Sequence, residues 1–320
     1  MSFFTRRLAA ACLAVMAAVA PAAAQELELT ITAPAGAGGG WDAAARSLQE
    51  VMMKTGAAKS VQVVNVPGAG GTVGLAQFAQ SAKGAPDQLL VGGITMVGAI
   101  LTNKAPVNLG DVTPIARLTG DPLVVVVPKD SPHQTLADLT AAIKADVANT
   151  IWAGGSAGGA DHILAALITQ AAGADPSKVN YVAYSGGGEA LAAMLGGQVT
   201  AGISGYGEWQ GQIESGDLRA LAISYPEPIE GIAAQPLKAQ GVDVELVNWR
   251  GVFAGPDISD ADKQALGAAI EQTVKSPEWQ ELLKARGWTD YYAPADEFKA
   301  FVESENERVH ATLKSIGLAE

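Results

Sequence analysis

The sequence predicts an α/β protein of two domains, each built on a mostly parallel sheet flanked by helices. Its 320 residues suffice for one large domain or two ordinary ones. Strand-like and helix-like segments alternate along most of the chain, an order typical of parallel sheets covered by helices. The 37 glycines exceed the average share of this residue, and many lie where a predicted strand leads into a predicted helix.

The first 24 residues have the order of a secretory signal peptide. Arg6 and Arg7 precede the apolar residues 8–20, and the alanines at 22–24 form an A-x-A cleavage site. The apolar stretch is too short to cross a membrane as a helix. A twin-arginine signal or lipid attachment at Cys12 fits the neighbouring residues poorly. We therefore expect cleavage at this site, export to the periplasm and a mature chain without cysteine.

The charged residues and the histidines argue against a nucleic-acid-binding protein and against a metal site. The mature chain would carry 19 basic and 33 acidic residues, a formal net charge of −14, with no basic stripe for nucleic acid. The three histidines, His133, His162 and His310, are scattered and form no metal-binding motif. We expect a monomer with no metal ion, no other cofactor and no nucleic-acid partner.

The N-terminal part repeats one unit, a strand followed by a glycine-rich loop and a helix. Residues 27–32 alternate and contain β-branched residues, as a strand does. Residues 34–40 are a glycine-rich loop, and from Trp41 to residue 53 the apolar residues fall on one helical face. The elements expected next are a strand at 61–66, a loop at 67–71, a helix ending at 82 and a strand at 88–94.

A second set of elements begins after residue 121. Residues 122–127 are an unbroken apolar run, which predicts a strand buried on both faces. The elements expected after it are a helix at 136–145, a strand at 150–153, a glycine loop at 154–159, a helix ending at 172, a strand at 179–184, a loop at 185–188, a helix at 189–195 and strands at 199–203 and 218–224. This repetition predicts a second sheet.

The C-terminal part changes to helices, which we expect to pack back onto the first domain. Ser259 begins a helix that ends at Lys275, with an Asp in place of the Glu of a capping box. Ser276 and Pro277 begin the next helix, and a long one covers 296–316.

Two crossings between the domains are expected, near residues 119–122 and near 225–236, where three prolines interrupt regular structure. Two crossings make the first domain discontinuous and the second domain an insertion. The predicted division is 1–24 for the signal peptide, 25–120 with 228–320 for the first domain, and 121–227 for the second.

Four glycine-rich loops begin four predicted helices, and none of them contains Lys or Arg. They are residues 34–40, 67–71, 154–159 and 185–188. Glycine lets a ligand approach the backbone closely, and a helix N-terminus offers free N–H donors and partial positive charge. One such loop is more often a simple tight turn. Four of them in an acidic protein predict a site where main-chain groups hold an anion.

Other glycine motifs fit less well. The dinucleotide pattern G-x-G-x-x-G fails because Trp41 and Val73 stand where the third glycine is required, and no P-loop lysine follows any glycine run. Residues 154–158 do match the G-x-S-x-G nucleophile elbow. The alternative function is therefore an exported hydrolase with Ser156 as nucleophile, which requires a histidine within hydrogen-bond reach of that hydroxyl.

Several motifs occur in an order known from one family. They are P-A-G-A-G-G-G-W-D at residues 34–42, N-V-P-G-A-G-G at 65–71, G-S-A-G at 155–158 with His162, and Y-S-G-G-G-E-A-L at 184–191. Together they resemble the periplasmic solute receptors of tripartite tricarboxylate transporters, the TctC or Bug family, over essentially the whole mature chain. The resemblance implies a type II-like periplasmic binding protein, not an enzyme, with its ligand in a cleft between two domains.

The resemblance also implies the kind of ligand and the partner. Receptors of this family bind a small carboxylic acid and deliver it to a membrane complex of one large and one small subunit. The G-G-G-W-D form of the first loop favours a tricarboxylate such as citrate, with a C4-dicarboxylate or another organic acid as the alternative. Ala35 stands where the family has an aromatic residue, which predicts a wider pocket.

By position, the resemblance assigns a set of ligand contacts. Those of the first domain are Gly39, Gly40, Trp41, Ala69, Gly70, Thr72, Thr95 and Met96. Those of the second domain are Ser156, Gly158, Ser185, Gly186, Ser204 and Tyr206. Asp42, in the first turn of a helix, is expected to be structural, because a carboxylate facing an anionic ligand would be unfavourable.

Overall fold

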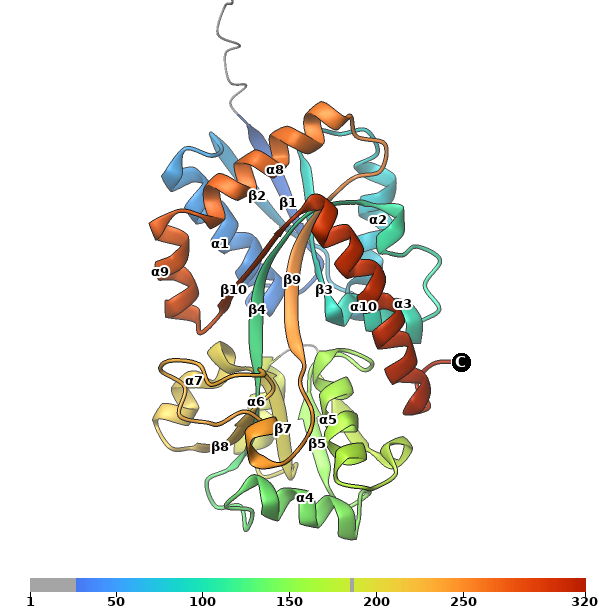
Figure 1. Ribbon diagram of the computed structural model, residues 1–320, viewed down its shortest axis with the longest axis vertical. Helices are drawn as coiled ribbons and strands as arrows, with labels where there is room; N and C mark the ends of the chain where they lie inside the picture. Colours follow the sequence, from blue (N-terminus) through green and yellow to red (C-terminus); the bar gives the residue numbers. More distant parts are fainter. Residues whose placement is uncertain (1–26, 185–186) are drawn as a thin grey trace, which may run out of the picture.

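Residues 27–184 and 187–320 are described by a computed structural model, and they form two lobes (Figure 1). The predicted signal peptide and Cys12 lie outside the described residues. The α/β fold class is confirmed, since strands and helices alternate through both lobes. Among the described residues, no helix has both the length and the apolar character needed to cross a membrane.

The first lobe, at the top of Figure 1, is formed by the N-terminal and C-terminal parts of the chain. Its strands are β1 (Glu28–Ala33), β2 (Ser60–Asn65), β3 (Gln88–Gly93) and β10 (Thr289–Pro294). Its helices are α1 (Gly40–Thr55), the 3₁₀ turn η1 (Ala69–Gly71), α2 (Thr72–Ser81), α3 (Ile94–Thr102), α8 (Asp260–Val274), α9 (Pro277–Arg286) and α10 (Ala295–Ser315).

The second lobe, at the bottom of Figure 1, is formed by the middle of the chain. Its strands are β5 (Ile151–Gly154), β6 (Asn180–Ala183), β7 (Ala201–Gly205) and β8 (Leu218–Ile223). Its helices are α4 (Leu136–Ala145), α5 (Ala160–Ala171), α6 (Gly187–Leu195) and α7 (Tyr206–Glu214). Three further 3₁₀ turns lie in connecting segments: η2 (Leu109–Asp111), η3 (Pro176–Lys178) and η4 (Lys238–Gln240).

Two sets of parallel strands are joined by antiparallel ones. β1 pairs in parallel with β2 and β3, and β5 pairs in parallel with β6 and β7. Between the two sets lie β4 (Thr113–Pro128) and β9 (Val247–Ala254), which pair antiparallel with each other. The strand order is β2-β1-β3-β9-β4-β7-β5-β6, and β4 runs through both lobes (Figure 1). The carboxyl ends of the parallel strands therefore face the space between the lobes.

Several elements differ from the sequence prediction for identifiable reasons. The helix α3 was not predicted, because it is buried on nearly all sides and so lacks an amphipathic period. Only residues 122–127 of β4 were predicted, and β9 was missed, because polar residues such as Arg117 and Arg250 interrupt the strand pattern. The strand β10 was also missed, as was α7, whose two glycines disfavour a helix.

The segment between β8 and β9 stays with the second lobe. The N–H of Leu237 donates to the carbonyl of Ile223 (2.9 Å), and the N–H of Leu246 donates to that of Ser224 (3.0 Å). β9 then pairs with the first-lobe part of β4. The domain boundaries at residues 120 and 228 remain a prediction. We propose that the chain returns from the second lobe to the first near Val247 rather than at 225–236.

One apolar cluster contains residues of both lobes. It includes Val97 of α3, Ile163 of α5 and Leu313 of α10, all buried. The last helix, α10, runs beside α3 toward the second lobe (Figure 1). A Cβ atom on Gly98 of α3 would overlap the carbonyl oxygen of Gly158 in the second lobe. The lobes therefore approach each other so closely because residue 98 has no side chain.

Candidate functional site

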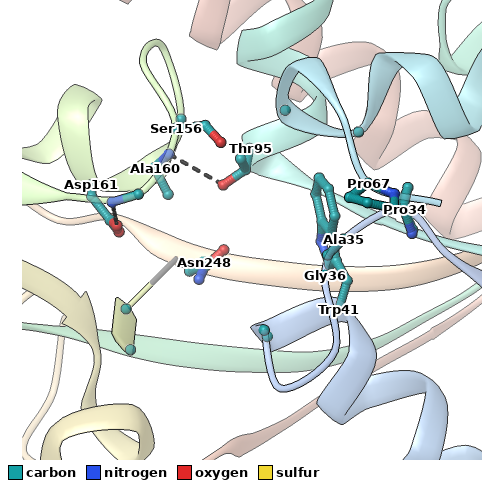
Figure 2. Close-up of a pocket in the computed structure, with 18 of the residues that line it drawn as sticks. Pro34, Ala35, Gly36, Trp41, Pro67, Thr95, Ser156, Ala160, Asp161 and Asn248 are labelled. Carbon is teal, nitrogen blue, oxygen red and sulfur yellow. Dashed lines mark hydrogen bonds between the residues drawn. The ribbon is translucent and has the colours of Figure 1, made fainter. Parts of the chain in front are cut away.

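A cavity of about 320 Å³ lies between the lobes (Figure 2). Two glycine loops of the first lobe form one wall, and the segments that follow β5 and β7 form the opposite wall. The connecting strand β9 contributes Asn248 and Arg250. In Figure 2, Asn248 lies between Trp41 of the first lobe and Asp161 of the second.

Five helical segments begin at the cavity with a glycine. The N-cap residues of α1, η1, α2, α5 and α7 line the cavity, and none provides a side-chain cap: Gly39, Gly68, Gly71, Gly159 and Gly205. The first N–H groups of these segments have no partner within their own helix. Some of them have partners outside the helix, as the N–H of Ala160 does in Thr95, and the others offer donors and partial positive charge to one cavity.

Helices that begin elsewhere are capped by side chains. Thr135, Ser259 and Ser276 cap α4, α8 and α9, and each side chain accepts an N–H of the first turn. None of these three residues lines the cavity. Among the described helices, α3 and α10 are exceptions, because their N-caps are Gly93, which does not line the cavity, and Pro294. Most of the helices that start with an uncapped glycine therefore begin at the cavity, where a bound anion can accept hydrogen bonds from their N–H groups.

The first glycine loop is fixed by Asp42. Its Oδ2 accepts the N–H of Gly38 (2.8 Å) and Nε–H of Arg46 (3.0 Å), and its Oδ1 accepts Nδ2–H of Asn65 (2.8 Å). Although burial raises it, these hydrogen bonds bring the pKa of Asp42 below its ordinary value. Asp42 does not line the cavity and acts on the loop from behind.

The second glycine loop packs closely against α3. Gly70 has a φ of +63°, and a Cβ atom there would lie 2.5 Å from the Cβ of Ala99. The hydroxyl of Thr72 donates to the carbonyl of Ala69 (2.9 Å), as does Nδ2–H of Asn103 (3.0 Å). These contacts hold the main chain of residues 68–71 at the cavity.

The loop after β5 is held by a stacked histidine and tyrosine. The rings of His162 and Tyr181 are parallel, with centroids 4.2 Å apart. Nδ1 of His162 accepts the N–H of Gly158 (3.2 Å), and the hydroxyl of Tyr181 donates to the carbonyl of Gly155 (2.8 Å). Burial lowers the pKa of His162 to about 4, so its ring is neutral near pH 7 and keeps its acceptor.

Ser156 lacks the partner that a serine nucleophile requires. Within residues 27–184 and 187–320, no hydrogen bond joins its hydroxyl to a histidine, and His162 uses Nδ1 for the N–H of Gly158. His133 precedes α4 and His310 lies on α10. The geometry therefore does not support the hydrolase alternative.

Arg250 places a cation in the cavity wall. It is 3% exposed, and its Nη2 donates to Oδ2 of Asp121 at 2.5 Å. Its guanidinium carbon lies 4.9 Å from the ring centroid of Trp288. Its Nη1 has no hydrogen-bond partner among the described residues. Burial raises the pKa of Asp121, while the attraction of Arg250 opposes that shift.

Two carboxylates line the wall of the second lobe. Oδ2 of Asp161 accepts the N–H of Gly155 (2.7 Å), and Oε2 of Glu208 accepts the hydroxyl of Ser204 (3.0 Å). Burial raises the pKa of Asp161 to about 7, and the carboxylates of Glu208 and Asp121 add to the shift. Glu208 stays exposed to water through the cavity, although the surrounding protein raises its pKa as well.

The structure gathers eight of the predicted contacts in the cavity wall. They are Gly39, Gly40, Trp41, Ala69, Gly70, Thr95, Ser156 and Ser204. Thr95 also joins the lobes, because its hydroxyl accepts the N–H of Ala160 at 3.3 Å (Figure 2). Ser185 and Gly186 lie outside the described residues. Which of these residues contact a ligand stays a prediction.

Four predicted contacts do not line the cavity and have structural surroundings instead. Met96 is fully buried, and Tyr206 is 6% exposed within the core of the second lobe. Thr72 is buried, with its hydroxyl bonded to the second loop. Gly158 backs onto Thr102, which a Cβ atom at this glycine would strike.

Four polar residues of the cavity were missed by sequence reasoning. A usable signal existed for Arg250, which is the one charged residue of the mostly apolar segment 247–254, because charged residues are rarely buried without a partner. Asp161 also lies two residues after a predicted glycine loop. Glu208 and Asn248 had no local signal, because only the fold brings them to the cavity. In the described part of the chain, no group of three or more His, Cys, Asp or Glu residues could hold a metal ion.

The fold and the cavity together define a class of protein, a two-lobed solute receptor with a cavity between its lobes. Residues 44–318 match the model of the tripartite tricarboxylate transporter family receptor, TctC. The chain therefore belongs to this family of periplasmic solute receptors, and the resemblance inferred from its motifs is confirmed.

Individual proteins are also similar to this chain in sequence or in fold. BugT of Bordetella pertussis is 29% identical over 278 residues, which cover 85% of this chain and 83% of BugT. MatC from Rhodopseudomonas palustris, solved with bound malate, is 22% identical with a TM-score of 0.78, covering 89% of this chain and 98% of MatC. Another R. palustris protein, solved with adipate, is 20% identical with a TM-score of 0.82, covering 91% and 98%. These two structures support the fold.

Proposed function

We propose that this protein is a periplasmic receptor that binds a small carboxylic acid and delivers it to a tripartite tricarboxylate transporter. The observation that carries the proposal is the group of glycine-capped helix starts around the cavity. Each helix end stabilises a carboxylate by about 0.3–1 kcal/mol, and by up to about 2 kcal/mol when partly buried. Several ends together support micromolar affinity, about −8 kcal/mol.

The proposed contacts divide between the two walls. Main-chain N–H groups of residues 40–41 and 69–70 hold a carboxylate of the ligand in the first lobe, because those of residues 39, 71 and 72 already donate to main-chain carbonyls. The hydroxyls of Ser156 and Ser204, together with Ser185 and Gly186, contact the ligand from the second lobe. Arg250, already paired with Asp121, adds positive charge from the connecting strand.

Among carboxylic acids we favour a tricarboxylate such as citrate, because the first loop has the G-G-G-W-D form. The cavity volume of about 320 Å³ lies at the lower end for ligand sites and suits a small acid. The neighbouring folds solved with malate and adipate keep dicarboxylates as alternatives. The protein acts as a monomeric receptor, not as an enzyme, and its partner is a membrane complex of one large and one small subunit.

Thermal unfolding of the mature protein with a panel of carboxylic acids and their neutral amides tests this function. A ligand at 100 times its Kd stabilises the folded state by about 2.7 kcal/mol. We expect at least one acid to raise the unfolding midpoint while its amide does not, because the helix starts attract negative charge. If no acid raises the midpoint more than its amide, the cavity is not a carboxylate site.

The Ser156→Ala substitution tests the second wall. The loss of one hydrogen bond to the ligand should weaken binding by about 0.5–1.5 kcal/mol, or by up to about 3 kcal/mol if the ligand atom is charged. Calorimetric titration with the acid found in the thermal screen measures this change. Ser304→Ala on α10 is the control, and equal affinity in both variants would remove Ser156 from the site.

A further inference from the structure

The second-lobe wall of the cavity carries two acidic side chains opposite the glycine loops. Asp161 lies across the cavity from Trp41 in Figure 2, and Glu208 lines the same wall as Asp161. Among the described lining residues, Arg250 is the one Lys or Arg, and it is already paired with Asp121. An anion held by the first lobe would therefore face uncompensated negative charge.

Each of these carboxylates keeps one oxygen free for a ligand. Oδ2 of Asp161 and Oε2 of Glu208 accept hydrogen bonds from their own lobe. The other oxygen of each carboxylate, Oδ1 of Asp161 and Oε1 of Glu208, accepts no hydrogen bond from the residues that the structure describes. The second lobe thus presents two unused acceptors to the cavity.

Glu208 and Arg250 also lie directly against the start of α1. A Cβ atom on Gly40 would be 2.5 Å from Nη2 of Arg250 and 3.3 Å from Oε1 of Glu208. The free acceptor Oε1 therefore lies beside the main-chain donors of the first lobe. One small molecule can reach both.

A second observation marks this region as a site for a polar ligand. Arg250 is 3% exposed, it lines the cavity, and its Nη1 has no partner among the described residues. A buried donor left unpaired is costly, and a ligand oxygen would satisfy it. Donors and acceptors thus occur together around the same cavity.

We infer that Asp161 and Glu208 select carboxylic acids that also carry a hydrogen-bond donor, a hydroxyl or an ammonium group, on their carbon chain. This inference rests on the proposed function. The carboxylate of the ligand binds at the helix starts, and its donor group binds Oδ1 of Asp161 or Oε1 of Glu208. An acid without such a donor would place its own charge close to the two carboxylates, and like charges at short range repel.

The test must be made at a pH at which Asp161 is ionised. The ionisable groups that face it are Glu208 of α7, Asp121 of β4, Arg250 of β9 and Tyr181 of β6. Because the pKa of Asp161 is raised to about 7, titrations at pH 8 keep its carboxylate ionised. At that pH the donor must come from the ligand.

Matched ligands that differ by one group provide the experiment. Calorimetric titrations of the mature protein at pH 8 compare succinate with malate and aspartate, and tricarballylate with citrate. We expect the substituted acid to bind more tightly than its parent, by on the order of 10- to 100-fold for one hydrogen bond to a charged group. Malate and aspartate distinguish the hydroxyl from the ammonium group.

Three variants assign the effect to the acidic wall. In Asp161→Asn or Glu208→Gln the ratio of affinities should fall toward one, while Glu303→Gln, an exposed change on α10, should leave it unchanged. Thermal unfolding confirms that each variant is folded. Equal affinities within each wild-type pair, or an unchanged ratio in both cavity variants, would overturn the inference. If no acid binds the wild type at all, the proposed function itself is wrong.

Discussion

Asp161 is the residue that links the cavity to pH. Burial raises its pKa from the ordinary value of 3.8 to about 7, and Asn can replace it without losing an acceptor for the N–H of Gly155. Between pH 4 and 7 the folded chain binds a proton that the unfolded chain has released. The contribution of Asp161 to stability is therefore present at low pH and is lost as the pH rises through this window.

The free energy of unfolding of the ligand-free protein, measured between pH 4 and 8, tests this sign. The difference between wild type and Asp161→Asn should shift by about 1 kcal/mol per pH unit across the window, with the wild type losing stability as the pH rises. The lowered pKa of His162 acts in the opposite direction, but it is present in both proteins. Parallel pH curves for the two proteins would contradict the raised pKa.

At the scale of elements, the loop between β5 and α5 depends on a support that is not part of the loop. Tyr181 reaches it from β6, the neighbouring parallel strand, and stacks on His162 of α5. Strand, loop and helix are thus tied together at the point where Ser156 enters the cavity.

Tyr181→Phe should loosen this loop while it keeps the stacked ring. Loss of the hydrogen bond to Gly155 should lower the free energy of unfolding by about 0.5–1.5 kcal/mol and weaken ligand binding as well. Denaturant unfolding and calorimetry measure the two effects, with Tyr292→Phe on β10 as the matched control. If stability falls but affinity does not, the loop does not take part in binding.

The glycine loops of the cavity could be predicted from the sequence because their signals are local. Gly39, Gly70 and Ser156 lie in glycine loops between a strand and a helix, a pattern that a few consecutive residues define. The parallel strands before these loops were predicted for the same reason. Arg250 and Glu208 were not, because β9 and α7 have interrupted patterns and reach the cavity only through long-range pairing.

At the scale of the whole molecule, the contact between Gly98 and Gly158 limits how far the lobes can close. Gly98 lies in the middle of α3, where alanine would favour the helix by up to about 1 kcal/mol. Its Cβ atom would nevertheless overlap the second lobe. A substitution at residue 98 therefore has opposite effects: it favours the helix of the first lobe, and it hinders the approach of the two lobes.

Gly98→Ala should therefore weaken ligand binding by at least tenfold without lowering the unfolding midpoint. The added methyl group would hold the lobes apart, and small-angle scattering with ligand should give a larger radius of gyration than for wild type. Gly267→Ala on α8 is the control, because a Cβ atom there meets no atom within 4 Å. Wild-type affinity in Gly98→Ala would show that binding does not require this contact.

The glycine-capped helix starts have a genetic consequence. A main-chain N–H is present whatever amino acid a codon specifies, with proline as the exception, so these donors do not depend on the identity of one side chain. The side chains of Ala35, Asp161 and Glu208 each change with a single codon. A lineage of such receptors can therefore exchange one acid for another through mutations in the cavity wall, while the means of holding the acid group is inherited unchanged.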